Sequence, residues 1–221
     1  MSAGSYLNIN ADENILTENE NNVNNTDRNF TFVIDPGHGG IDGGAVGVSG
    51  SLEKDINLSL SIVMRDIMEV LGYDAVLTRE EDVLLGEGTT GHMKLEDLRY
   101  RVEYVKQYEN PLFVSIHMNK FPEEYCHGLT VYYSGNDTES EVLGRSVRDE
   151  VVKQLQKDNE RPMKKATSAL YVLHRATVPA ILIECGFLSN RDEEQKLLDE
   201  NYKKKLAMTI VSGLVLYAEG K

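Results

Sequence analysis

The sequence predicts one α/β domain with a largely parallel or mixed central sheet. Short apolar runs alternate with segments of helical periodicity, which is typical of this class. Three of the runs lack polar alternation, as strands covered on both faces do. The length of 221 residues suits one well-cored domain, and no repeat or second domain is visible. We therefore expect a leader at residues 1–29 and a single folded domain at residues 30–221.

The predicted strands are short runs rich in β-branched and aromatic residues. They cover residues 30–34, 74–78, 111–116, 129–133, 170–173 and 179–184. The first, third and last of these are apolar throughout, which predicts that they lie in the centre of the sheet. Each delivers a chemically useful residue at or just after its end: His38, His117 and Glu184. Because ligands of open α/β sheets bind outside the carboxyl ends of the strands, these three residues indicate a site.

The predicted helices are segments in which apolar residues recur every three or four positions. They cover residues 54–71, 94–108, 139–157 and most of 192–218. The first of them carries Ile56, Leu60, Val63 and Ile67 at this spacing. Each helix lies between predicted strands or after the last one, as the α/β class requires.

The N-terminal segment, residues 1–29, is polar and rich in Asn and Glu. Such a segment buries too little apolar surface to offset its ordering entropy, so we expect a disordered leader or linker. No apolar stretch reaches the roughly 18–20 residues that span a bilayer, and no signal peptide is visible. A linker with nothing in front of it predicts an exported, extracytoplasmic protein whose signal or membrane anchor precedes this sequence.

Charge and cysteine content exclude several classes of function. With 23 basic and 36 acidic residues, the net charge of −13 argues against a nucleic-acid groove and against binding to an anionic membrane. Cys126 and Cys185 belong to no CxxC pair, so a disulfide framework is excluded. Cys185 lies in an apolar run, which predicts a buried thiol.

A glycine-rich stretch, DPGHGGIDGGAVG, follows the first strand. It matches neither of the glycine patterns that cradle phosphates, and a flexible linker would not follow a buried strand. The glycines instead allow the backbone to turn sharply around His38 and allow a bulky substrate to approach.

Two imidazoles and a carboxylate form a candidate metal site: His38, Glu53 and His117. Catalytic zinc in hydrolases commonly takes three such ligands and leaves a position for water. Taken singly, Glu53 in a first helical turn could serve the helix dipole, and His117 could be a core histidine. His92, His127 and His174 have no partners at ligand spacing, and we assign them no role.

Glu184 is the candidate catalytic residue, because a metal site of this kind still needs a group that accepts and returns a proton. A structural ion pair is the alternative for this carboxylate. Asn119 is a candidate for substrate binding or for stabilising a turn. Arg79 and Arg99 are candidates for binding substrate carboxylates, with an exposed, solvated position as the alternative for both.

Four segments carry a family resemblance: IDPGHGGIDGGAVG, LEKDINL, SIHMN and ILIECGFLSN. In this order they resemble the zinc-dependent N-acetylmuramoyl-L-alanine amidases, which cleave bacterial peptidoglycan, over about residues 30–218. The resemblance implies a phosphorylase/hydrolase-like α/β catalytic domain with a mixed sheet of roughly six strands flanked by helices. It also implies Zn²⁺ held by His38, Glu53 and His117, with Glu184 as the catalytic carboxylate. Lys120 and Cys185 depart from the family pattern without touching these roles.

The implied reaction is hydrolysis of the amide between N-acetylmuramic acid and L-alanine. TREEDVLL, LEDLRYR and LYVLHRATVPAILIE resemble, more loosely, the branch that acts on spore cortex. Because wall hydrolases of this kind are commonly gated, we expect an activating or regulatory protein partner. The alternatives are a zinc peptidase or deacetylase with the same metal chemistry, and a non-catalytic peptidoglycan-binding protein.

Overall fold

The chain folds around one six-stranded mixed sheet, in the order β2-β1-β3-β6-β4-β5. This computed structural model describes Met1, residues 30–86 and residues 92–220, so the predicted leader lies outside the described residues. Strands β2, β1, β3 and β6 run parallel, whereas β4 is antiparallel to β6 and parallel to β5. The strands are β1 (Thr31–Pro36), β2 (Asp74–Leu77), β3 (Pro111–Asn119), β4 (Thr130–Tyr133), β5 (Lys164–Lys165) and β6 (Ala180–Phe187). The predicted fold class is confirmed.

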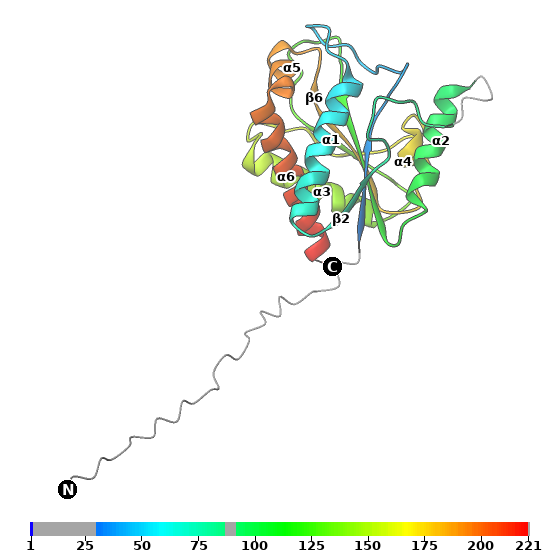
Figure 1. Cartoon of the computed structure of the whole chain (residues 1–221). Coiled ribbons are helices and arrows are strands. Elements are labelled where there is room, and N and C mark those ends of the chain that lie inside the picture. The colour runs from blue at the N-terminus through cyan, green and yellow to red at the C-terminus, as the bar shows by residue number, and fades with distance from the viewer. Residues whose placement is uncertain (2–29, 87–91, 221) are drawn as a thin grey trace.

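Helices cover both faces of the sheet (Figure 1). They are α1 (Glu53–Val70), α2 (Met93–Val105), α3 (Glu139–Gln154), α4 (Tyr171–Arg175), α5 (Arg191–Leu198) and α6 (Glu200–Glu219). Helices α1, α3, α5 and α6 pack on the face that carries the larger apolar core, and α2 and α4 pack on the other. Among the described helices, none has the length and apolar character that crossing a membrane requires.

The three uninterrupted apolar runs lie side by side as β1, β3 and β6, so their prediction as central strands is confirmed. Alternate residues of each strand serve different cores: Phe32 and Ile34 of β1 belong to the larger core, whereas Val33 belongs to the smaller one. Burial on both faces explains why these runs lack polar alternation.

The strand predicted at residues 170–173 is wrong. These residues lead into α4, which buries Val172 and Leu173 in the smaller core, and the edge strand β5 precedes them. A four-residue apolar run does not distinguish a short helix from a strand by its periodicity. The helix predicted over most of residues 192–218 is confirmed with one break, at Asp199, whose side chain accepts a hydrogen bond from the N–H of Tyr202 at the start of α6.

Candidate metal centre

Three side chains from separate elements converge at the carboxyl edge of the sheet. His38 lies in the loop after β1, Glu53 is the first residue of α1, and His117 lies near the end of β3. One potential ligand atom from each residue lies within 4.8 Å of the other two. His38 Nε2 is 3.2 Å from Glu53 Oε2, and His117 Nδ1 is 2.9 Å from Glu53 Oε1. The structure thus brings together the three residues predicted as ligands.

The backbone at His38 is held in an unusual conformation. Its φ of 62° lies in the left-handed region, which costs energy for a residue with a side chain. Two buried arginines hold this loop by donating to its carbonyl groups. Arg101 donates to Pro36 O (2.8 Å) and His38 O (2.7 Å), and Arg79 donates to Pro36 O (3.0 Å) and Gly37 O (3.1 Å).

Two of the glycines are required by close approach at the site. A Cβ at Gly37 would lie 2.2 Å from the ring of His117. Gly44 has a φ of +67°, and a Cβ there would lie 2.6 Å from Glu53 Oε2. The glycine-rich stretch therefore lets the loop pack directly on the ligand side chains, a close approach that the sequence did not predict.

The Glu53 carboxylate is surrounded by donors. It accepts hydrogen bonds from the N–H groups of Ala45 (2.7 Å) and Met118 (3.0 Å), besides its contacts with both histidines. Burial alone would raise the pKa of Glu53, but the hydrogen bonds and charges of His117 and His38 outweigh it and hold that pKa well below its usual range. Glu53 is thus kept ionised, as a metal ligand must be.

Asp42 orients the first histidine and was not singled out by the sequence. Its Oδ2 lies 3.1 Å from His38 Nδ1, on the side of the ring away from Glu53. Lys94 Nζ (3.3 Å) and the N–H of Gly44 (3.2 Å) contact the same carboxylate. A carboxylate that accepts from Nδ1 leaves Nε2 of His38 free to bind a metal.

Glu184 stands in a different environment. It lies on β6 directly across from His117 of β3, and no described group makes a hydrogen bond to its buried Oε2. Burial raises the pKa of Glu184 to about 7; the charge of His117 opposes this shift and the charge of Glu53 adds to it. A carboxyl with such a pKa can both accept and donate a proton near neutral pH.

The donor set fits a catalytic metal. Two imidazole nitrogens and one carboxylate oxygen are a common ligand set of zinc hydrolases, and they leave positions for water and substrate. His38 and Glu53 also have supporting contacts outside the ligand group, with Asp42 and with the N–H groups of Ala45 and Met118, which fix their orientation. The described part of the chain can therefore hold a metal ion at His38, Glu53 and His117.

A cavity of about 170 Å³ adjoins the two histidines. Its wall includes Lys94 of α2, Leu182 of β6 and Tyr171 of α4. Asn119 is half-buried at the end of β3, two residues beyond His117. Arg99 is exposed on α2 and is not among the residues that line the cavity.

Arg79 is neither exposed nor available to a substrate, so both sequence-based interpretations of this residue are wrong. Its guanidinium is buried and donates to backbone carbonyls on either side of the loop, including Lys54 O at 2.9 Å.

Arg101 is fully buried, but it was not among the residues predicted from the sequence. It forms salt bridges to Asp97 (2.8 Å) and Asp35 (2.6 Å), and the latter also accepts from Thr78 (2.6 Å). Burial alone would lower the pKa of Arg101, but the two carboxylates keep it charged. The spacing of Asp97 and Arg101, four residues apart on a helix, is the signal that indicates the pair.

Comparisons with known proteins identify the family of this chain. The family model described as N-acetylmuramoyl-L-alanine amidase matches residues 32–215. The germination-specific N-acetylmuramoyl-L-alanine amidase of Bacillus subtilis is 38% identical over 187 residues, which are 83% of this chain and 78% of that protein. The CwlD amidase of Clostridioides difficile, solved in complex with the GerS lipoprotein, superposes with a TM-score of 0.81 at 36% identity, over 86% of this chain and 99% of that one.

A further solved structure is similar to this chain. The amidase AmiC2 of Nostoc punctiforme has a TM-score of 0.75 at 32% identity, over 87% of this chain and 98% of that one. The family model covers most of the chain, and these relatives agree with it. The chain belongs to the N-acetylmuramoyl-L-alanine amidase family and is a hydrolase that acts on peptidoglycan.

Proposed function

We propose that residues 30–221 form a zinc-dependent catalytic domain in which His38, Glu53 and His117 hold the metal and Glu184 is the catalytic residue. One observation carries this proposal. A buried carboxyl with an unpartnered oxygen and a pKa of about 7 lies across from a ligand of a His–Glu–His group. A structural ion pair, the alternative for Glu184, would require a cationic partner, and none of the described salt bridges includes this residue.

When bound at this group, zinc would polarise the scissile carbonyl and lower the pKa of a bound water. Glu184 accepts the proton of the attacking water and then returns it to the departing nitrogen of L-alanine. Burial of Glu184 suits both steps, because a pKa near 7 makes proton acceptance and proton donation comparably easy. Asn119 and Arg99 stay candidates for binding substrate.

The substrate we propose is the spore-cortex form of peptidoglycan. The support is the 38% identity to a germination-specific amidase and the likeness to the CwlD amidase. Both relatives also support an extracytoplasmic location. The CwlD structure contains a lipoprotein partner, which supports our expectation that a protein partner regulates this chain.

Mass spectrometry of purified muropeptides tests the reaction. Incubation with the chain and zinc is expected to release a free peptide that begins with L-alanine and to leave the glycan intact. A cut within the peptide would instead indicate a peptidase, and loss of acetate would indicate a deacetylase. Protein treated with a chelator is the control and is expected to release nothing.

A further inference from the structure

One segment of this acidic chain contains no acidic residue. Residues 161–183 contain no Asp or Glu, although the whole chain has 36. The segment carries four basic residues: Arg161, Lys164, Lys165 and Arg175. None of the four forms a salt bridge with a described residue, whereas Arg65, Arg145 and Arg148, which lie outside the segment, are each paired with a neighbouring acid. Within the described residues, no carboxylate neutralises their positive charge.

Aromatic rings hold three of these cations in place. Arg161 lies 4.4 Å from the ring centroid of Phe187, Lys164 lies 5.8 Å from that of Tyr132, and Arg175 lies 5.8 Å from that of Tyr171. The ring face attracts a cation electrostatically, so such contacts stabilise the position of the charged group. They restrict each side chain while leaving its charge unneutralised, which prepares the group to bind an anion.

Two of the rings connect the cations to the candidate active site. Tyr171 lines the same cavity as His38 and His117. Tyr132 of β4 lies directly across from Leu182 of β6, another residue of that cavity, and Lys164 of β5 lies directly across from Tyr132. Because side chains directly opposite each other in a sheet share a face, Leu182, Tyr132 and Lys164 form a row leading outward from the cavity.

The charge of Glu184 also reaches this row. Burial raises the pKa of Tyr132, the charge of Glu184 raises it further, and the charge of Arg161 lowers it. Thr130 of β4, two residues before Tyr132, lies directly across from Glu184, so the row adjoins the position at which the amide bond would be cut.

We propose that Lys164 and Arg175 form a subsite that binds the carboxylates of the stem peptide beyond its L-alanine. This subsite rests on the proposed amidase function and extends it, because it assigns the direction in which the peptide leaves the metal centre. Guanidinium and ammonium groups are suited to carboxylates, and an acidic protein needs such a local cationic surface to hold an acidic peptide.

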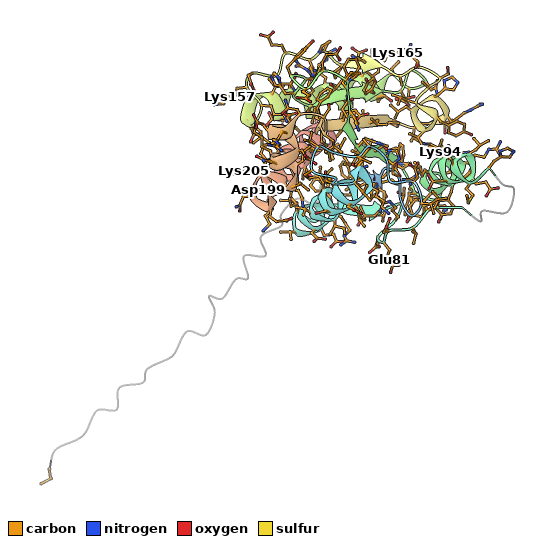
Figure 2. All side chains as sticks on the ribbon, turned by 90° about the horizontal axis from the view of Figure 1, so that it is seen from above. Glu81, Lys94, Lys157, Lys165, Asp199 and Lys205 are labelled. Atoms are coloured by element: carbon orange, nitrogen blue, oxygen red, sulfur yellow. The ribbon has the colours of Figure 1, made fainter. Side chains whose placement is uncertain are left out.

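Two synthetic substrates test the subsite: N-acetylmuramoyl-L-alanyl-D-glutamate, and the same compound with both peptide carboxyl groups converted to amides. Each is assayed with zinc against the wild type, Lys164→Gln, Arg175→Gln and the double variant. Lys205→Gln is the matched control, because Lys205 is exposed on α6, away from Lys165 of β5 (Figure 2).

For the wild type we expect a KM about tenfold lower for the free acid than for the amide. The double variant is expected to lose this preference through a higher KM for the acid, with kcat unchanged and with the amide cleaved as before. Equal KM values for both compounds in the wild type would overturn the subsite while leaving the amidase function standing. Cleavage of neither compound would reject the amidase function, and the subsite with it.

Discussion

Two carboxylates of this site, Glu53 of α1 and Glu184 of β6, have different surroundings. Glu53 accepts hydrogen bonds from two backbone N–H groups and contacts both histidine rings. Glu184 is partly exposed as a residue, but its Oε2 is buried and has no hydrogen-bond partner among the described residues. The pKa of Glu53 is held far below its usual range, whereas burial raises that of Glu184 to about 7.

The comparison shows how one fold gives the same functional group two roles. A carboxylate that is always ionised is a permanent ligand, and a carboxyl that titrates near neutral pH is a carrier of protons. The difference arises from what faces each carboxyl: both histidine rings and the N–H groups of Ala45 and Met118 face Glu53, whereas no described group makes a hydrogen bond to Glu184 Oε2.

The largest effect is expected from removing the charge of the ligand carboxylate. Glu53→Gln keeps the size of the side chain but leaves two neutral histidines to hold the metal. We expect zinc affinity to fall by more than the roughly 100-fold that loss of an outer hydrogen-bond partner costs. Competition with a chromogenic chelator measures this affinity. Asp55→Asn, in the same helical turn but exposed, is the control, and an equal loss in both variants would contradict the assignment.

Unfolding of the metal-free protein tests the environment of Glu184. Its pKa is about 7 in the folded state against an ordinary value of 4.5, so below pH 4.5 the group is protonated in both states and does not change the free energy of unfolding. As the pH rises from 4.5 to 7, the unfolded state releases the proton first, and the free energy of unfolding of the wild type falls.

Glu184→Gln removes this fall in the free energy of unfolding, because glutamine does not titrate. The variant is therefore expected to gain stability over the wild type as the pH rises, reaching on the order of 3 kcal/mol above pH 7. Urea unfolding at pH 4.5, 6 and 8 in the presence of a chelator measures the difference. A difference that is the same at all three pH values would mean that Glu184 is not perturbed by burial.

A smaller effect is expected from changing Asp42, which contacts Nδ1 of His38. Asp42→Asn weakens the acceptor that holds Nδ1 of His38 and leaves the ligand atoms in place. Zinc affinity is expected to fall about 10- to 100-fold, the usual cost of losing such a partner. The same chelator assay measures it, and affinity equal to that of the wild type would show that Asp42 does not orient the ring.

The sequence was informative about the parts of the site that depend on local pattern. Apolar runs located β1, β3 and β6, and the residues at their ends located His117 and Glu184, because parallel strands end at one edge. Pattern alone did not resolve residues 170–173, where an apolar run too short to show a period forms α4.

Polar contacts between residues far apart in the chain also could not be predicted from the sequence. Arg79 was expected at the surface or at a substrate, but it is buried against carbonyls of a loop more than 40 residues away. No property of its neighbours in sequence indicates this, since the acceptors are backbone groups. The contrast between Glu53 and Glu184 was hidden because it depends on which distant groups fold against each carboxyl, the two histidines above all.

The most direct test of that contrast is to measure zinc content and turnover of Glu184→Gln in the same preparation. We predict that the variant binds zinc with nearly the affinity of the wild type and cleaves muropeptides about 10²- to 10⁴-fold more slowly, because only the proton carrier is lost. Loss of zinc together with turnover would make Glu184 part of the metal site, and retained turnover would remove it from the reaction; either result would contradict the division of roles between the two carboxylates.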